Sequence, residues 1–180
     1  MPKIQSPTSA IPGIETERLT LRSHRLQDFD DSAAMWGDPE VTRYIGGRPF
    51  PKEEVWTKLL RYVGHWSVMG FGYWVIRDRA TGRFVGEVGF ADFKRDIQPS
   101  LEGAPEIGWA LAPWAHGKGL ATEAVRASVA WGVTHFESGR TVCLISPENL
   151  ASIRVAEKCG YKEFKRTTYK GQPTILFERK

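Results

Sequence analysis

The sequence predicts a mixed α/β fold in which antiparallel strands come first and a strand–helix–strand–helix segment follows. Residues 16–22 (TERLTLR) alternate polar and apolar side chains, as a half-buried strand does. Residues 55–69 place apolar side chains at steps of four and three, the spacing of an amphipathic helix. From residue 106 a strand pattern runs through a glycine-bearing turn into a long helical pattern, and a second strand and helix follow.

Size and composition favour one domain. The chain has 180 residues, of which 41% are hydrophobic and seven are tryptophan, enough for a sizeable core. Residues 1–13 contain Pro2, Pro7, Pro12 and Gly13 and show little periodicity. We therefore expect a flexible leader at 1–13 and a single domain at 14–180.

Charge and cysteine content exclude several classes of protein. No segment approaches the roughly 20 apolar residues of a membrane span, and the N-terminus lacks the apolar core of a signal peptide. We expect a cytoplasmic monomer or weak homodimer. The net charge of +4 is dispersed without long basic runs, so it does not indicate a nucleic-acid partner. Cys143, Cys159 and the four histidines lack metal-ligand spacing, which predicts two buried free thiols and no metal.

The first half of the chain alternates helices and strands. A short helix is predicted at 26–36, ending before Asp38-Pro39, and a longer one begins after Pro51. Residues 72–77 and 83–93 have strand patterns, and the linker between them (DRATG) has turn chemistry. These two strands should therefore form an antiparallel hairpin.

The second half contains the segment with two helices. A strand is predicted from 106 to about 113, a helix at 117–135, a strand at 140–146 and a helix at 149–159. The early turns of the first of these helices carry small residues that permit close approach to a sheet. Residues 161–168 and 174–178 should form a final hairpin across Lys170-Gly171.

The turn at 117–122 (GKGLAT) has the chemistry of a phosphate site. A glycine turn at a helix N-terminus leaves several N–H groups unpaired, and the helix dipole adds positive charge. The spacing is not that of a P-loop, and Thr122 stands where a dinucleotide fingerprint needs its third glycine. The segment therefore predicts either a phosphorylated ligand of another kind or a purely structural turn.

Five segments in the same order resemble the GNAT superfamily of acetyl-CoA-dependent N-acetyltransferases, in particular the RimJ/RimL-like branch (similar to ribosomal-protein-alanine acetyltransferases). They are residues 16–22, 38–44 (DPEVTRY), 86–90 (GEVGF), 106–109 (EIGW) with 117–124 (GKGLATEA), and 149–161 (NLASIRVAEKCGY). The resemblance covers about residues 14–177. It implies a single, mostly antiparallel sheet of about seven strands with a splayed parallel pair, flanked by about four helices.

The resemblance also implies acetyl-CoA as cosubstrate, without a metal, lying between the two splayed strands. The family's loop pattern (Arg or Gln, two residues, Gly, one residue, Gly or Ala) falls on His116, Gly119 and Ala121, so His116 departs from it. Backbone N–H groups would bind the pyrophosphate and the preceding strand would bind pantetheine. The residues implied in cofactor binding are Trp109, Ala110, Leu111, His116, Gly117, Lys118, Gly119, Leu120, Ala121, Thr122, Asn149 and Ser152.

A general base is needed because most amines are protonated at neutral pH. Glu106, at the start of the central strand, is the first candidate, although it could instead close a salt bridge. Glu87, in an apolar and glycine-rich run, is the second, and it could equally face solvent. Glu102 is the third candidate.

A general acid could protonate the leaving thiolate, and Asn149, Ser152 and Tyr161 are the candidates. Asn149 and Ser152 share a helix face, but Asn149 could also simply cap that helix. Tyr161 could instead be a core residue. The acceptor amine is a protein N-terminus or a small amine such as an amino acid, polyamine or antibiotic, and a non-catalytic acyl-CoA-binding or regulatory domain is the alternative to an enzyme.

Overall fold

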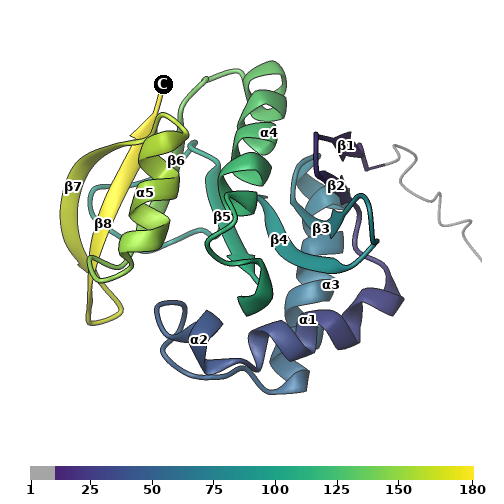
Figure 1. Ribbon diagram of the computed structural model, residues 1–180. Helices are drawn as coiled ribbons and strands as arrows, with labels where there is room; N and C mark the ends of the chain where they lie inside the picture. Colours follow the sequence, from purple (N-terminus) through teal and green to yellow (C-terminus); the bar gives the residue numbers. More distant parts are fainter. Residues whose placement is uncertain (1–10) are drawn as a thin grey trace, which may run out of the picture.

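The computed structural model describes residues 11–180, which form one eight-stranded sheet with helices on both faces (Figure 1). The predicted leader lies mostly outside the described residues, and within them the Pro12 carbonyl accepts a hydrogen bond from the Trp74 indole at 2.8 Å. The strands are β1 (Ile14–Glu15), β2 (Leu19–Arg22), β3 (Tyr73–Asp78), β4 (Phe84–Ala91), β5 (Glu106–Leu111), β6 (Thr141–Ile145), β7 (Lys162–Tyr169) and β8 (Gln172–Arg179).

The helices of the described residues are close to those expected. They are α1 (Phe29–Trp36), α2 (Pro39–Thr42), α3 (Lys52–Met69), α4 (Leu120–His135) and α5 (Leu150–Lys158), with short 3₁₀ turns at Leu26–Asp28 and Pro113–Ala115. The four expected helices are present, and α2 is an additional single turn that begins with Pro39 after the cap Asp38. None of the described helices combines the length and apolar character that crossing a membrane requires.

The strand order is β1-β2-β3-β4-β5-β6-β8-β7, and every neighbouring pair is antiparallel except β5 and β6. This confirms the predicted mixed α/β fold with one parallel pair. β7 forms one edge of the sheet, where most of its side chains are exposed, and a register shift lies between Glu163 and Lys165. The two-residue β1 forms the other edge.

The single strand predicted at 16–22 is wrong in its first half, because a turn divides it into β1 and β2. The Thr16 amide donates to the Leu19 carbonyl at 2.9 Å, and the Thr16 hydroxyl accepts from the Leu19 amide at 3.0 Å. Glu123 on α4 accepts from the Thr16 hydroxyl at 2.6 Å and the Arg18 amide at 2.8 Å. Polar–apolar alternation did not reveal this turn, because the partner that stabilises it is about 100 residues away in the sequence.

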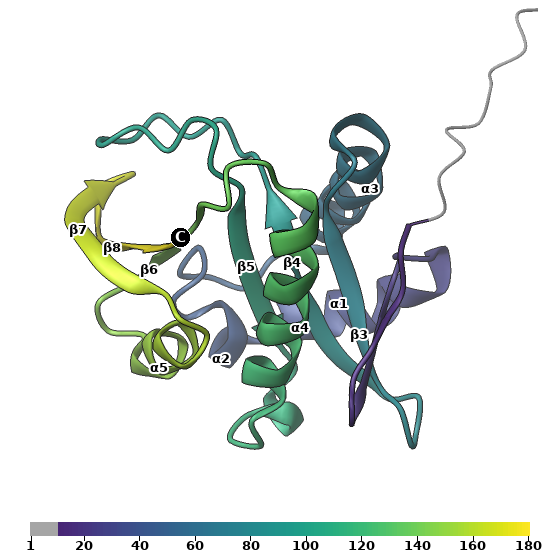
Figure 2. The same cartoon turned by 90° about the horizontal axis from the view of Figure 1, so that it is seen from above.

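The two faces of the sheet are covered by different helices, as Figure 2 shows from above. α4 and α5 pack on one face in a cluster that includes Val88, Ile107 and Val125. α1 and α3 cover the other face, where Trp36 and Val55 pack against Val75 and Ala110. The helical stripe predicted along α3 is confirmed at Val55, Leu59, Tyr62 and Trp66, which are buried, but not at Met69, which is exposed at the end of the helix. Cys143 and Cys159 are buried free thiols, as expected.

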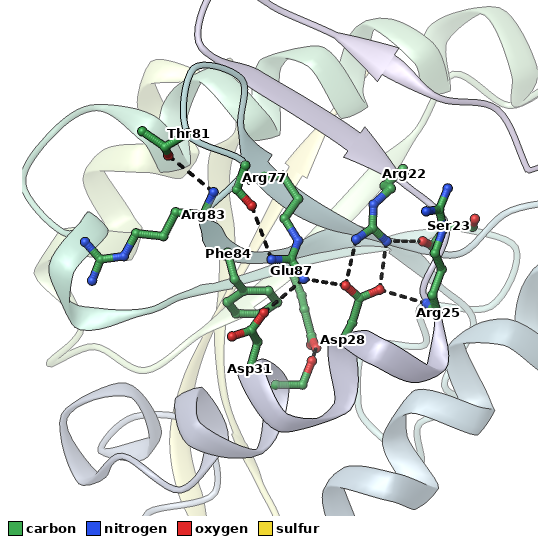
Figure 3. Close-up of polar contacts among 12 residues, drawn as sticks. Arg22, Ser23, Arg25, Asp28, Asp31, Arg77, Thr81, Arg83, Phe84 and Glu87 are labelled. Carbon is green, nitrogen blue, oxygen red and sulfur yellow. Dashed lines mark hydrogen bonds and ion pairs between the residues drawn. The ribbon is translucent and has the colours of Figure 1, made fainter.

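A buried carboxylate joins the start of α1 to strands β2 and β3 (Figure 3). Asp28 has no exposed side-chain surface and accepts from both terminal nitrogens of Arg22 at 2.7 Å and from Arg77 at 2.5 Å. The Arg25 amide donates to the same carboxylate at 2.8 Å. Burial by itself raises the pKa of Asp28, but the bonds from Arg22 and Arg77 outweigh it and lower the pKa to about 2.

We expect Asp28→Asn to lower the free energy of unfolding at pH 7 by about 2–3 kcal/mol, because the variant loses two charge-assisted pairs. The native pKa lies below the ordinary value of 3.8. The carboxylate's contribution is therefore complete above that value and is lost as the pH falls towards 2. Urea unfolding of wild type and variant at pH 7, 4 and 2.5 should show the difference shrinking. Asp31→Asn, which removes a half-exposed partner of Arg77, is the matched control and should cost less than 1 kcal/mol. A difference that does not change with pH would contradict this account.

Candidate functional site

The parallel strands β5 and β6 are paired at a single position, Glu106 with Val142. Beyond it they diverge, and β6 continues in register with β8 over all five of its residues. The separation predicted for this pair is therefore present.

The main chain of β5 turns unpaired groups towards this separation. The Pro105 carbonyl accepts from the Val142 amide at 3.1 Å and so faces β6, whereas the Ala112 amide donates to Val85 beside β4. Because main-chain groups alternate sides along a strand, those of Trp109 and Leu111 face the space between β5 and β6.

The chain then turns into α4 through two glycines in the left-handed region, Gly117 (φ 72°) and Gly119 (φ 75°). Gly119 is the N-cap of α4 and has no side chain to cap the first turn. The one acidic residue of that turn, Glu123, binds Thr16 and Arg18 instead. The amides of residues 120–122 therefore keep the anion-binding capacity of a helix N-terminus.

A surface depression of about 760 Å³ lies beside this turn. Gly119 and Thr122 line it together with three basic residues (Arg18, Arg126 and Lys158) and two acidic ones (Glu17 and Glu123), and Glu123 pairs with Arg18. The basic residues outnumber the acidic ones and add to the positive end of α4, so the depression suits an anionic ligand.

His116 and Lys118 both contact other parts of the site. The His116 Nε2 lies 2.8 Å from the Leu111 carbonyl, to which it donates, and its Nδ1 lies 3.5 Å from Glu40. The Lys118 carbonyl accepts from Arg18 at 2.9 Å, and the Lys118 ammonium lies over the Trp114 ring. His116 thus covers the carbonyl that β5 turns towards β6.

The other residues predicted to bind the cofactor fall into two sets. Leu111 and Leu120 are buried in the α4-side core, and Trp109 and Ala121 pack against that core. Ala110 faces α1 instead.

Asn149 and Ser152 lie at the start of α5. The Asn149 carboxamide oxygen accepts from the Ser152 amide at 3.1 Å, so Asn149 caps the helix. α4 and α5 each begin after the C-terminal end of one of the two parallel strands, so their N-termini lie at the same edge of the sheet. Tyr161 lies elsewhere, because its buried hydroxyl is 2.7 Å from Thr141 at the start of β6.

Glu106 is largely buried and forms a bidentate ion pair with Arg95, at 2.5 Å to Nε and 2.7 Å to Nη2. Burial raises the pKa of Glu106, and Arg95 only partly opposes this. The Arg95 guanidinium lies over the rings of Phe93 and Tyr169, with its Cζ 4.7 and 5.0 Å from their centroids. Glu106, Phe93, Arg95 and Glu102 line a cavity of about 220 Å³.

Glu87 is also buried, but its environment lowers its pKa, whereas that of Glu106 is raised. Its carboxylate accepts from the Ser32 hydroxyl at 2.8 Å and the Trp36 indole at 3.0 Å, and His24 Nε2 lies 3.6 Å away. Burial raises the pKa of Glu87, but His24, Lys58 and Ser32 outweigh it and lower the pKa. Glu87 is therefore held as a carboxylate, whereas Glu106 is the more basic of the two.

Sequence reasoning missed Arg95 and Lys58. Arg95 lies in a connection without periodicity, and Lys58 was one of many surface-type lysines in the sequence. Only the fold brings them beside Glu106 and Glu87.

Comparison with known proteins identifies the family of the chain. The family model described as "Acetyltransferase (GNAT) domain" matches residues 18–162. "Uncharacterized protein YkkB" of Bacillus subtilis is 32% identical over 170 residues, covering 92% of this chain and 94% of its own. "Uncharacterized N-acetyltransferase p20" of Bacillus licheniformis is 31% identical over 149 residues, covering 82% and 81%.

Solved structures show the same fold. A GnaT-family acetyltransferase from Bordetella pertussis superposes with a TM-score of 0.82 at 30% identity, covering 94% of this chain and 99% of its own. Two more distant structures are spermidine N-acetyltransferase from Vibrio cholerae with CoA and spermine (TM-score 0.71, 18% identity, covering 91% and 96%) and RimL ribosomal L7/L12 acetyltransferase with CoA (0.72, 16%, 95% and 97%). At these identities the two distant structures show likeness of fold alone.

We expect Arg95→Met to raise the pKa of Glu106 further, because the burial that already raises it would be unopposed. The Glu106 carboxyl would then hold its proton more tightly in the folded protein than in the unfolded chain. The free energy of unfolding should therefore fall as the pH rises from about 4.5 to 7. Carboxyl NMR titration and urea unfolding measure the two effects. Arg140→Met, which breaks the partly exposed pair with Glu178, should lack this pH dependence. An unchanged Glu106 pKa in Arg95→Met would show that Arg95 does not control it.

Proposed function

The chain belongs to the GNAT acetyltransferase family and is an N-acetyltransferase, and from its geometry we propose how it holds acetyl-CoA and activates a primary amine. The observation that carries the proposal is the separation of β5 and β6 directly before the uncapped, glycine-initiated α4. A strand edge and a helix N-terminus then lie in succession, as an extended, diphosphate-bearing ligand requires.

The donor set fits acetyl-CoA. The amides of residues 117–122 would hold the pyrophosphate, and the main chain of Trp109 and Leu111 would bind pantetheine as an added strand. The basic residues of the neighbouring depression would complement the remaining charge. Acetyl-CoA supplies the acetyl group as a thioester, and its binding at Leu111 requires His116 to release the carbonyl that it now covers.

Glu106 is proposed as the general base that takes a proton from the acceptor ammonium, directly or through water. Its raised pKa suits this role at neutral pH better than the lowered pKa of Glu87. Arg95 occupies both Glu106 oxygens, so an incoming ammonium would compete with its guanidinium. The oxygens of Glu87 are engaged by Ser32 and Trp36, which assigns Glu87 a positioning role.

The Leu111 amide is proposed to stabilise the oxyanion that forms when the amine adds to the thioester. Because the Asn149 side-chain oxygen is engaged in its cap, the Ser152 hydroxyl is the better candidate to protonate the departing thiolate. Tyr161 is proposed as a core residue, since its hydroxyl binds Thr141.

The acceptor is a primary amine, and the RimJ/RimL resemblance makes a protein N-terminus one candidate and small amines the other. The distant neighbours act on both kinds by their descriptions, so they do not select between them. Calorimetric titration with acetyl-CoA, with ATP as comparator, followed by a thiol-release screen of peptides and small amines, tests the function. Absence of acetyl-CoA binding would refute it.

Gly119→Val should weaken acetyl-CoA binding at least tenfold, because the branched side chain strains a left-handed backbone and intrudes where the amides of α4 point. Gly82→Val is the control, since Gly82 has a similar φ of 70° in the β3–β4 turn. Both variants should lose stability, but only Gly119→Val should lose affinity by calorimetry. Equal affinities would remove the loop from the binding site.

Glu106→Gln should lower kcat by about 10²–10⁴-fold, the range for loss of a general base, while the Kd for acetyl-CoA changes little. Glu102→Gln, on the lining of the same cavity, is the control and should retain activity. Thiol release followed from pH 6 to 9 measures the effect. Wild-type turnover in Glu106→Gln across that range would place the base elsewhere.

A further inference from the structure

Two cations of α3, Lys58 and Arg61, form no ion pair with a carboxylate of residues 11–180. The Lys58 ammonium lies 4.2 Å from the Trp36 ring centroid and 5.5 Å from that of Tyr62, and the Arg61 Cζ lies 5.8 Å from the Tyr62 centroid. Among the ion pairs within 4 Å that the described residues form, none includes either side chain. Both cations thus lie against aromatic faces and form no ion pair within residues 11–180.

Lys58 is the more enclosed of the two. Burial lowers its pKa to about 8, Glu87 opposes this, and the charges of Arg61 and Arg95 add to the lowering. Within residues 11–180 the Lys58 ammonium is not fully buried, so it keeps some contact with solvent. A largely desolvated cation next to two others is unfavourable unless an anion pairs with it.

The carboxylate that already lies nearby, Glu87, is bound by other residues. Glu87 accepts from Ser32 and Trp36, with His24 at 3.6 Å, and makes no ion pair within 4 Å with Lys58. Arg95 is paired with Glu106, so Lys58 and Arg61 are the two of these three cations that form no ion pair within residues 11–180.

These cations lie on the face of β5 that carries Glu106. Trp36 and Phe50, whose rings are near the Lys58 ammonium, pack in one cluster with Ala110 of β5. Tyr62 stacks on Tyr73 with centroids 4.4 Å apart, and the Tyr73 hydroxyl lies where a side chain at Gly108 would be. Positions 106, 108 and 110 alternate onto the same face of the strand, opposite α4.

We propose that Lys58, assisted by Arg61, binds a carboxylate of the acceptor, so that the acceptor is a small amine carrying an acid, an amino acid. This inference rests on the proposed function, because it concerns the acceptor of the same reaction. A polyamine or aminoglycoside would bring further cations towards Lys58 and Arg61, which disfavours both classes. A peptide N-terminus followed by an acidic side chain has the same chemistry and is a separate arm of the test.

The first experiment compares matched acceptors with the full-length protein. Thiol release at saturating acetyl-CoA is measured with the proteinogenic amino acids, their C-terminal amides, spermidine, and short peptides with Asp or Ala at position 2. We expect kcat/KM for the preferred amino acid to exceed that for its amide by on the order of 10–100-fold, the value of a charged hydrogen bond. Turnover confined to peptides with Asp at position 2 would overturn the free amino acid as acceptor.

The second experiment tests Lys58 itself. Lys58→Met should reduce the acid-to-amide ratio of kcat/KM on the order of 10–100-fold, chiefly through KM, and Lys58→Arg should restore part of the preference. Lys52→Met, an exposed lysine at the start of the same helix, is the matched control. A purely structural role would lower activity towards the acid and the amide equally, and that result would overturn the proposal. If Lys58→Met does not fold, the acid-to-amide ratios of kcat/KM measured for Lys58→Arg and for the wild type decide whether Lys58 binds the carboxylate.

Failure of this inference is distinguishable from failure of the proposed function. Equal turnover of acids, amides and spermidine by the wild type overturns the inference and leaves the acetyltransferase intact. Absence of acetyl-CoA binding refutes the proposed function. If acetyl-CoA binds but no amine is turned over, the CoA-loaded protein is titrated with N-acetyl amino acids and their amides. Tighter binding of the acids that is lost in Lys58→Met supports the inference, and equal or absent binding overturns it.

Discussion

The site depends on one constraint, the failure of β5 and β6 to pair beyond Glu106 and Val142. A parallel pair in a sheet interior would ordinarily satisfy its main-chain groups along its full length. Here each strand is instead held from its other side, β5 by six paired positions with β4 and β6 by five with β8. Because these antiparallel partners fix both strands, the sheet tolerates an interruption between them, and the unpaired groups of β5 are available to a ligand. α4 and α5 then begin at the same edge, which directs two helix N-termini to it.

The two buried glutamates show how environment separates groups of identical chemistry. Glu87 lies among donors (Ser32, Trp36, His24) that favour its charged form. Glu106 meets one strong partner, Arg95, which does not fully offset its loss of hydration. The pKa values of the two carboxyls are therefore displaced in opposite directions, the arrangement by which a protein assigns a proton-accepting role to one and a structural role to the other. Asp28 is a third case, in which two arginines tie the first helix to the sheet.

Much of the fold could be predicted because its elements carry local signals. The stripe of α3, the turn between β3 and β4 and the glycines before α4 each identify an element without its neighbours. The turn at residues 16–18 could not be predicted in this way, because Glu123 stabilises it from across the molecule. The same limit applies to the site. Glycine-rich spacing indicated the loop at 117–122, and position in a strand indicated Glu106. The Arg95 pair, the Lys58 contacts and the His116 bond to Leu111 depend on tertiary proximity that no periodicity encodes.

The edges of the sheet limit how copies of this protein can associate. β7, the outer strand on one side, presents Lys162, Glu163, Lys165 and Arg166 to solvent, and a register shift interrupts it. β1, on the opposite side, offers only two residues. A neighbouring strand would have to desolvate closely spaced charges at one edge and would gain few hydrogen bonds at the other. The sheet is thus protected against continuous strand addition between molecules, so an eight-stranded sheet with two open ends can remain free of the edge-to-edge aggregation that threatens such architectures.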